Sequence, residues 1–517
     1  MRATSTDQTA IIVRVPHQRT DPADGEPADW PPSPEDRPDE PEPLTNPRLT
    51  VLSWLVPFLV AGGLGWWNLA RPGLSEDELA TWGMVTIGWA EFRGVLENVD
   101  ASVGAYYVLL RLWAAVAGDT DLLLRLPSVL FGAAAAAVVA GIGIRLAGRR
   151  AGLTAGLVFA LLPGFSRYAQ DARPYALVML AAAVSTYILI GLVDRPRARA
   201  YVGYSFSVLI LGLSHVVALL LLVAHLLLVV RVRRSWRPFL AWACAVLVGV
   251  SPALPVLYLG QVQSGGQIGW IPPLTWDRLA ETPERLFGAT IIAGAVIALA
   301  LTALSLRTSA HALTLWALAP VAALAAVAQL TPLWVPRYLL FVLPAWALLA
   351  GLALCRLSVL RGLVAVLGIG LLAIPAQADI RTVYGHDYAS RDIAEVIKAN
   401  QAAGDAVLFG PFADGDQRTS RDAFMRYMPA QRPADKLMVR APRTGGTLGA
   451  QECPDAEIPS CFGKPSRVWV VRKGGWTNIV QNIGDAKEAL LRQDFVQSEI
   501  WPLKGFTVAL YIRKPAG

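Results

Sequence analysis

Charged side chains are scarce in this sequence. Only 16% of the 517 residues are Asp, Glu, Lys or Arg, and 54% are hydrophobic, whereas an average soluble domain carries roughly 25% charged residues. The shortage excludes an ordinary soluble protein and predicts a polytopic membrane protein. Cysteine is scarce as well: four residues are too few for a fold that depends on a disulfide framework.

Two other signals are absent. No cleavable signal peptide is expected, because the first apolar run begins only near Leu49 and is long enough to remain as a membrane span. The net charge of +7 does not indicate a nucleic-acid partner, because the arginines separate apolar runs instead of gathering with aromatic residues. Arginines in such places set membrane topology.

Composition divides the chain into three parts. Residues 1–47 contain ten acidic residues, four arginines and many prolines, and they offer too little apolar surface to fold. They are predicted to be a disordered cytoplasmic tail. Residues 48–378 form the predicted membrane domain. Residues 379–517 have the composition of a soluble domain and are predicted to lie outside the membrane.

Apolar runs and arginine-rich connections alternate along the membrane domain. Arg145, Arg149 and Arg150 mark the junction between the runs 122–146 and 151–165, and alternate connections along the domain are similarly basic. The run 200–230 is too long for one span and is expected to break near Ser214 and His215. Because basic connections face the cytoplasm, the pattern predicts about eleven transmembrane helices in the plasma membrane, with a cytoplasmic N-terminus and an extracytoplasmic C-terminus.

The first outer loop, residues 70–121, does not fit this series. Its apolar run of about 12 residues contains Arg111 and is shorter than the ~20 residues that a membrane-spanning helix needs. The loop is therefore predicted to form helices that lie against the bilayer, with Tyr106, Tyr107 and Trp113 in the headgroup zone.

The last 139 residues show helix and strand patterns in turn. Helices are expected over 390–402 and 484–493, and strands over 406–409, 467–472 and 506–513. The pattern predicts a small α/β domain. Cys453 and Cys461, eight positions apart in a loop-rich part, are either a disulfide or two free thiols, and an oxidising outer compartment favours the disulfide.

Three adjacent carboxylates, Glu76, Asp77 and Glu78, follow the first span by about one turn. Successive residues on a helix diverge by about 100°, so only one or two of them can face a common cavity. Ser75 is placed to be the N-cap of a helix that begins here, and acids stabilise a helix start. The cluster is then a helix cap, a metal site or a catalytic group, and a cap alone does not require three acids.

Further polar residues fall on the same predicted outer face. The loop 167–175 holds Arg167, Asp171, Arg173 and Tyr175, and it is either a solvated turn or part of a site. Charges at a membrane boundary are costly and indicate function.

Two later positions also lie on this predicted face. Arg337 and Tyr338 follow two prolines; the arginine could hold a phosphate or extend to the interface as a snorkelling side chain. His215, at the expected helix break, is a packed core residue, a ligand or a general acid.

An ordered set of short motifs runs through the membrane part. The set comprises Asp77-Glu78, Tyr106-Tyr107, Arg125-Leu126-Pro127, the loop 167–175, Ser214-His215, Arg337-Tyr338 and Leu343-Pro344. In this order the motifs resemble the polytopic glycosyltransferases of the GT-C class. The chain is most similar to the family of protein O-mannosyltransferases and lipid A aminoarabinose transferases, and within it to the group of actinobacterial mannosyltransferases, over residues 50–376.

The resemblance implies a transferase that moves mannose or a related sugar from a polyprenyl phosphate to an extracytoplasmic glycan, lipid or protein, with inversion. It places Asp77 as the catalytic base with Glu78 beside it, and Asp171 as a second acidic residue. Glu76 is then left for the helix end. The implied substrate-binding residues, with Arg337 and Arg173 on the donor phosphate, are Arg337, Tyr338, Arg173, Tyr175, Arg167, Asp100, Tyr106 and His215.

The sequence departs from many such relatives before the tyrosine pair, where Asp100 to Gly104 replace a basic residue and prolines. A different residue must then make that phosphate contact. No cofactor is expected. Three adjacent acids could hold Mg²⁺ or Mn²⁺, but a metal-independent reaction is favoured, since the relatives generally need none.

Two other functions fit the composition. A transporter or lipid flippase also places charges along its substrate path, but it should show two related halves with broken helices in matching positions, and no such repeat is visible. A membrane anchor that only presents the C-terminal domain would leave the charges at the membrane edge unexplained.

Overall fold

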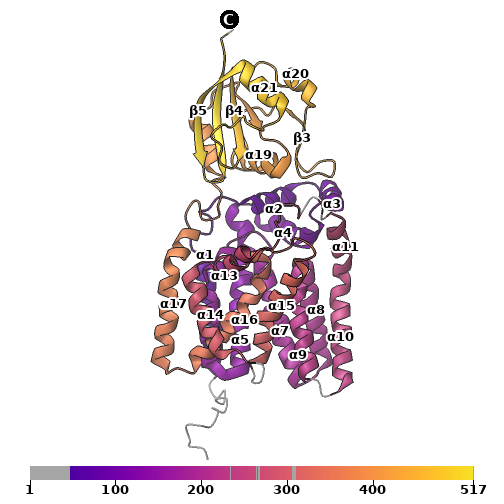
Figure 1. The fold of residues 1–517 in the computed structure, drawn as a ribbon, viewed down its shortest axis with the longest axis vertical. Coiled ribbons are helices and arrows are strands. Elements are labelled where there is room, and N and C mark those ends of the chain that lie inside the picture. Colours follow the sequence, from indigo (N-terminus) through magenta and orange to yellow (C-terminus); the bar gives the residue numbers. More distant parts are fainter. Residues whose placement is uncertain (1–46, 233–234, 264, 266–267, 306–309, 516–517) are drawn as a thin grey trace, which may run out of the picture. The chain divides into compact units, whose positions relative to one another are not determined.

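The computed structural model describes residues 47–232, 235–263, 265, 268–305 and 310–515. The predicted disordered tail, apart from Pro47, lies outside these residues. Figure 1 shows long helices side by side in one bundle and a separate layer of strands with short helices, formed by the C-terminal part of the chain.

Helices make up the part of the chain that was predicted to lie in the membrane. In order they are α1 (Pro47–Trp66), α2 (Glu76–Thr86), α3 (Trp89–Asn98), η1 (Ala101–Val103), α4 (Gly104–Ala117), α5 (Asp121–Leu161), α6 (Pro163–Ala169), α7 (Tyr175–Asp194), α8 (Ala198–Ser214), η2 (Val216–Leu220), α9 (Leu221–Val232), α10 (Trp236–Val250), η3 (Ser251–Ala253), α11 (Leu254–Val262), α13 (Trp276–Phe287), α14 (Thr290–Ala303), α15 (His311–Val327), η4 (Pro336–Val342), α16 (Leu343–Cys355) and α17 (Val359–Ile380).

α5 is two antiparallel helices joined by a tight turn. The backbone leaves the helical region at Ala147 and Gly148, where Gly148 has φ 84°, a conformation that favours glycine. A Cβ on Gly143 would lie 2.7 Å from the Cα of Gly152, so only glycine allows the two halves to approach this closely. The turn falls between the predicted crossings 122–146 and 151–165.

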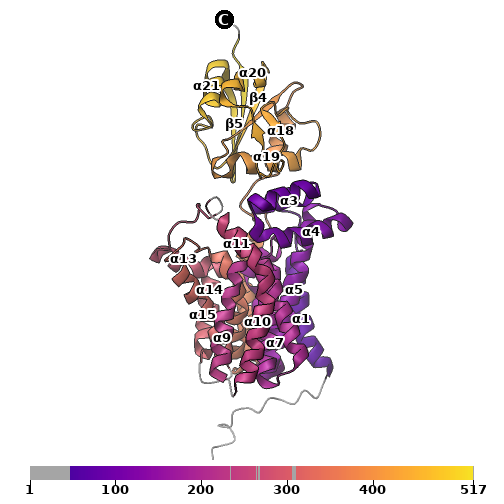
Figure 2. The ribbon, with the colours of Figure 1, turned by 90° about the vertical axis from the view of Figure 1, so that its right-hand side faces the viewer.

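Among the described residues, six helices are long and apolar enough to cross a membrane, or seven when the bent pair α13 and α14 is taken as one span. Further apolar helices of 10–17 residues, such as α8, α15 and the η2–α9 segment, run beside them (Figure 2). The chain is a multi-pass membrane protein, and about eleven crossings stays a prediction. The break expected near His215 is present, between α8 and η2.

The first outer loop forms the short helices α2, α3 and α4, as predicted. The headgroup placement of its tyrosines was wrong. Tyr106 and Tyr107 are 1% and 0% exposed, because both hydroxyls have polar partners within the protein: Tyr106 pairs with Ser128 at 3.0 Å, and Tyr107 donates to Asp100 at 3.1 Å.

The C-terminal part forms a four-stranded sheet in the order β1-β4-β6-β5. β1 (Ala406–Phe409) is parallel to β4 (Arg467–Lys473), whereas β6 (Phe506–Arg513) is antiparallel to β4 and to β5 (Phe495–Leu503). The remaining elements are α18 (Asp392–Asn400), η5 (Ala413–Gly415), α19 (Asp416–Tyr427), β2 (Met438–Arg440), β3 (Gln451–Glu452), η6 (Asp455–Glu457), α20 (Ile458–Phe462) and α21 (Asp485–Asp494). A disulfide joins Cys453 and Cys461.

β1, β4 and β6 of this sheet are apolar on both faces, as expected for strands that are covered on both sides. Val407, Phe409 and Val471 on one face belong to a single buried cluster with Leu74 and Leu79 at the start of α2. The domain and the first outer loop therefore share one hydrophobic core, which positions the C-terminal loops beside the three carboxylates.

Candidate active site

A large cavity of about 1820 Å³ lies where the outer loop, the helix bundle and the C-terminal domain meet. Nine of the eleven predicted site residues line it: Asp77, Asp171, Arg337, Tyr338, Arg173, Tyr175, Arg167, Asp100 and His215. Glu78 and Tyr106 do not. Residues from distant parts of the sequence thus meet at one site, although their individual roles stay predictions.

The three carboxylates of α2 point in three directions, as the 100° step along a helix requires. Asp77 faces the cavity with its side chain 40% exposed, and its Oδ2 lies 3.7 Å from Nη2 of Arg337. Glu78 points into the protein interior and is fully buried. Glu76 points toward the C-terminal domain. Only Asp77 combines access to the cavity with a cationic neighbour that belongs to the bundle.

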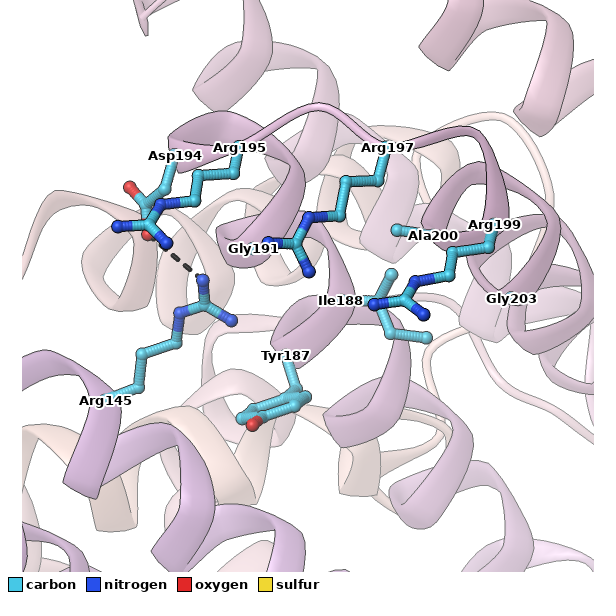
Figure 3. Close-up of a pocket in the computed structure, with 10 residues that line it drawn as sticks. All are labelled: Arg145, Tyr187, Ile188, Gly191, Asp194, Arg195, Arg197, Arg199, Ala200 and Gly203. Atoms are coloured by element: carbon cyan, nitrogen blue, oxygen red, sulfur yellow. Dashed lines mark hydrogen bonds and ion pairs between the residues drawn. The ribbon is translucent and has the colours of Figure 1, made fainter. Parts of the chain in front are cut away.

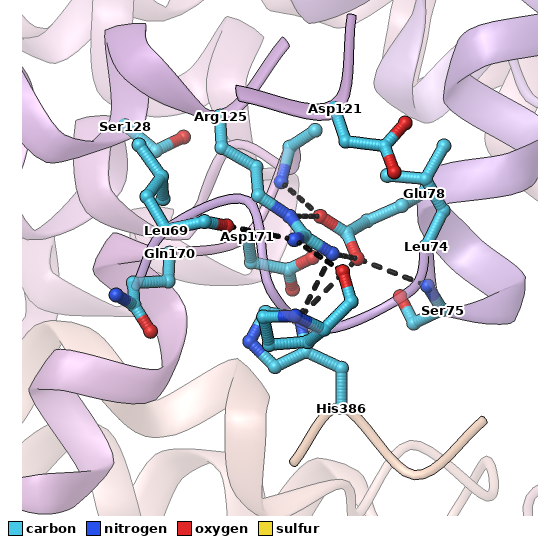
Figure 4. A network of polar contacts seen from close by, with 12 residues as sticks. Leu69, Leu74, Ser75, Glu78, Asp121, Arg125, Ser128, Gln170, Asp171 and His386 are labelled. Carbon is cyan, nitrogen blue, oxygen red and sulfur yellow. Dashed lines mark hydrogen bonds and ion pairs between the residues drawn. The ribbon is translucent and has the colours of Figure 1, made fainter. Parts of the chain in front are cut away.

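Glu78 is held by the first turn of its own helix and by a buried arginine (Figure 4). Its carboxylate accepts the backbone N–H of Ser75 at 3.0 Å, which closes a capping box. Nε and Nη2 of Arg125 donate to its two oxygens at 2.6 and 2.7 Å, and the N–H of Ala172 donates at 3.0 Å. Glu78 therefore fixes α2 against the loop after α6 and does not reach the cavity.

Arg125 also binds the turn that leads into α2. Its guanidinium donates to the backbone oxygens of Leu69, Pro72 and Gly73 at 2.9–3.0 Å, and Nη2 lies 3.1 Å from Nδ1 of His386. Burial alone would raise the pKa of the Glu78 carboxyl, but Arg125 holds that pKa well below its ordinary value. The position of Asp77 thus depends on a buried ion pair one residue further along the helix.

His386 approaches this pair from beyond the last bundle helix. Burial lowers the pKa of its imidazole well below the ordinary value, and the cations Arg167 and Arg125 lower it further. The ring is neutral at pH 7, so it completes the network as a hydrogen-bonding group and does not act as a cation.

Glu76 connects α2 to the C-terminal domain. Its oxygens accept hydrogen bonds from Tyr388 at 3.0 Å, Arg418 at 3.2 Å and Thr419 at 3.0 Å, and Nζ of Lys473 lies 2.7 Å away. These donors come from three segments of the domain: the stretch before α18, α19 and β4. This contact explains why a third acid is present beside a cap and a cavity carboxylate.

Three guanidinium groups set the charge state of Asp77. Burial raises the pKa of the carboxyl, but Arg173, Arg337 and Arg418 together outweigh that effect and lower the net pKa below its ordinary value. Asp77 is therefore ionised at neutral pH and is available to accept a proton or a hydrogen bond.

Asp171 lies in the same cavity, but its pKa is raised, whereas that of Asp77 is lowered. Burial and the negative charge of Glu78 raise its pKa to about 7, against the weaker effect of Arg167, whose Nη1 is 3.8 Å away. Its side chain is 5% exposed. Near neutral pH this carboxyl changes its charge, and it can then donate or accept a hydrogen bond.

Arginines and aromatic rings line the cavity beside the acids. Nη1 of Arg173 donates to the hydroxyl of Tyr107 at 3.1 Å, which in turn donates to Asp100. Arg337 lies over the ring of Trp270 at 5.4 Å. Such cations, with N–H groups toward an open cavity, suit a phosphate ligand.

The rest of the lining divides into polar and apolar parts. The ring centroids of His215 and Tyr338 are 4.7 Å apart, with the ring planes tilted by 59°. Apolar side chains continue the lining on the bundle side, at Val216, Val217, Val256, Leu257, Val327 and Leu333. A ligand with a charged head and a long apolar tail would match this division. In the part of the chain that the structure describes, no group of three or more His, Cys, Asp or Glu is placed to hold a metal ion.

Several residues at the site could not be predicted from the sequence. His386, Tyr388, Arg418 and Lys473 belong to a segment whose pattern is that of an ordinary soluble domain, so nothing in the sequence singles them out. Arg125 had a signal, because it is a lone charge at the start of a long apolar run. Tyr106, predicted to bind substrate, is buried behind the cavity.

Comparisons with known proteins identify the class. Residues 103–259 match the model of the family described as dolichyl-phosphate-mannose-protein mannosyltransferase. The structure is similar to ArnT from Cupriavidus metallidurans in the apo state, with a TM-score of 0.61, 14% identity and coverage of 89% of this chain and 98% of ArnT. The same protein bound to undecaprenyl phosphate gives a TM-score of 0.60, 15% identity and the same coverage. No curated protein sequence matches the chain.

The fold and the matches define a polytopic membrane glycosyltransferase of the GT-C class. Within that class the chain is similar to the mannosyltransferase and ArnT-like proteins that its ordered motifs resemble, and residues 103–259 carry the match to the family model. The predicted fold class and enzyme class are confirmed, and the predicted resemblance agrees with these matches.

Proposed function

We propose that the chain transfers mannose or a related sugar from a polyprenyl phosphate to an acceptor hydroxyl outside the cytoplasm, with inversion at the anomeric carbon. The observation that carries this proposal is the pairing of an ionised, cavity-facing Asp77 with Arg337 at the boundary between polar and apolar lining. The binding of undecaprenyl phosphate by the similar ArnT structure supports a donor of this kind.

In this mechanism Asp77 is the base. Its carboxylate takes the proton of the acceptor hydroxyl while that oxygen forms a bond to the anomeric carbon. The bond from the anomeric carbon to the phosphate oxygen breaks, and its electron pair leaves with the polyprenyl phosphate. The lowered pKa of Asp77 keeps the base ionised over a wide pH range.

Arg337 and Arg173 stabilise the leaving phosphate. Preorganised positive charge lowers the barrier most where negative charge develops, and both guanidiniums lie beside the cavity with the acceptor base. The apolar lining at Val216, Val217 and Leu257 would hold the first isoprene units of the donor.

The orientation in the membrane follows from charge. The connection after α7 and the turn inside α5 are rich in arginine, and such connections face the cytoplasm. The cavity and the C-terminal domain then face the opposite side of the plasma membrane. The Cys453–Cys461 disulfide supports this placement, because disulfides persist in oxidising compartments.

The test uses the full chain in liposomes with radiolabelled undecaprenyl-phosphate mannose and, as the acceptor source, membranes from cells that lack the chain. Asp77→Asn should reduce sugar transfer by about a hundredfold or more, the usual contribution of a general base. Asp387→Asn is the matched control, since Asp387 lines the same cavity, is 76% exposed and pairs only loosely with Lys504 at 3.5 Å.

The control should keep activity within about twofold, as expected for an exposed ion pair. Full transfer by a well-folded Asp77→Asn protein would overturn the mechanism. Equal losses in both variants would show that the cavity needs negative charge in general and no particular base.

A further inference from the structure

A second pocket lies at the other end of the bundle. It encloses about 650 Å³ between α5, α7 and the start of α8, and it is lined by Arg145, Tyr187, Ile188, Gly191, Asp194, Arg195, Arg197, Arg199, Ala200 and Gly203 (Figure 3). α7 begins at the active-site cavity with Tyr175 and ends here at Asp194. Its 20 residues separate the two sites by about 30 Å at 1.5 Å per residue, so this pocket is not part of the catalytic site.

Positive charge dominates the pocket. Four arginines line it against one carboxylate, Asp194, which pairs with Arg145 at 3.2 Å. Arg195, Arg197 and Arg199 are exposed, and within the described residues no carboxylate lies at ion-pair distance from any of them. The start of α8 adds the partial positive charge of a helix N-terminus.

Small residues leave the space open. A Cβ on Gly191 would lie 2.8 Å from Nη1 of Arg145, so glycine lets the guanidinium lie across α7. Figure 3 shows Arg197, from the connection after α7, and Arg199, from the first turn of α8, extending toward Tyr187 and Ile188 of α7. An anion in this space would meet guanidinium groups from three different segments.

The surface next to the pocket is apolar and exposed. Val202 is 70% and Phe206 61% exposed. They follow Arg199 by three and seven residues, respectively, and therefore lie on nearly the same face of α8. Tyr187, 40% exposed, has the position of an aromatic residue at headgroup level. A free anion would use only the arginines, whereas a phospholipid would also cover this apolar strip.

We propose that this pocket binds the phosphate headgroup of an anionic phospholipid of the cytoplasmic leaflet, with the acyl chains along Val202 and Phe206. Basic pockets between transmembrane helices on the cytoplasmic side bind such headgroups. The site is independent of sugar transfer: it lies on the arginine-rich side of the bundle and shares no residue with the active-site cavity.

The test compares the wild-type full chain with two double variants in nanodiscs of phosphatidylcholine that contain a minor fraction of phosphatidylglycerol. Arg197→Gln with Arg199→Gln changes the pocket. Arg237→Gln with Arg361→Gln removes the same charge from exposed positions on the same side of the bundle. Lipid that remains after a detergent wash is quantified by mass spectrometry.

Phosphatidylglycerol retention should fall about tenfold or more in the pocket variant, given the contribution of each arginine near an anionic headgroup, and it should be unchanged in the control. Equal retention in all three proteins, or an equal loss in both variants, would overturn the proposal. Inorganic phosphate should displace the lipid no better than sodium chloride of the same ionic strength; specific displacement would show a site for free anions instead.

Gly191→Leu provides a variant that keeps every charge. The larger side chain fills the pocket beside Arg145, so phosphatidylglycerol retention should fall as in the arginine variant. Melting temperatures in phosphatidylcholine alone establish that each variant is folded. A folded Gly191→Leu protein with wild-type retention would contradict binding within the pocket.

Discussion

Arg125 binds both carboxylate oxygens of Glu78, and neither side chain has any exposed surface. Removal of one partner from a buried ion pair leaves an uncompensated charge and costs about 3–5 kcal/mol. Arg125 also holds three backbone oxygens of the turn before α2. The pair therefore stabilises the fold and positions Asp77.

Arg125→Gln should accordingly lower the stability of the protein by about 3–5 kcal/mol, measured as a large drop in melting temperature in detergent. Arg285→Gln is the matched control. Arg285 pairs with Glu281 at 3.1 Å with both side chains more than half exposed, and such pairs contribute about 0–1 kcal/mol. Similar melting temperatures for the two variants would contradict the structural role of Arg125.

Arg337→Ala should impair the use of the donor. Loss of a charged hydrogen-bonding group from the phosphate site costs about 1.5–3 kcal/mol, which corresponds to a fall in kcat/KM for the polyprenyl-phosphate sugar of roughly tenfold to hundredfold. Initial rates at varied donor concentration measure this change. Arg278→Ala, at an exposed position on α13, should leave it unchanged. If kcat and the donor KM stay at wild-type values, Arg337 does not bind the donor phosphate.

Asp171 should make stability depend on pH. Because its pKa is raised from 3.8 to about 7 in the folded protein, the native state binds more protons than the unfolded state between these values. The free energy of unfolding contributed by this residue therefore falls as pH rises through that range. Melting temperatures at pH 5 and pH 7.5 should differ less for Asp171→Asn than for the wild type. An identical pH dependence in the two proteins would show that Asp171 is ionised throughout.

Glu76→Gln should loosen the contact between α2 and the C-terminal domain. The substitution removes the charge that Lys473 and Arg418 share, so the amides of α2 and α19 should exchange hydrogen faster while those of the central strand β6 do not change. Hydrogen exchange with mass spectrometry measures this difference. Glu97→Gln, an exposed carboxylate on α3, is the control, and equal exchange in both variants would contradict the role of Glu76.

Periodic and compositional signals predicted much of the fold. The bounds of β1 and β6 agree with the expected strands 406–409 and 506–513, because these strands are apolar on both faces. Other elements gave no such signal. α19 has no apolar stripe. Its buried side chains are largely polar and are satisfied by ion pairs, as Arg421 is by Asp435 and Glu452. β5 is an edge strand with mostly exposed side chains.

The sequence predicted which charged residues share one face of the protein. It did not predict the direction in which each acid points or the partner that each acid binds. Topology and motif order brought Asp77, Asp171 and Arg337 to a common side. The division of labour among the three acids depends on partners such as Arg125 and His386, which lie 47 and 308 residues from Glu78. Local sequence carries no information on such pairings.

The separation between Glu78 and His386 has a consequence for synthesis. At about 5–20 residues per second, Arg125 is made within seconds of Glu78, whereas His386 follows about 15–60 s later. The Glu78–Arg125 pair can therefore anchor α2 while the polypeptide is still growing. The cavity acquires its remaining walls only when Arg418 and Lys473 have been made and have packed against α2. A prematurely terminated chain would therefore contain every predicted catalytic residue and still lack a complete active site.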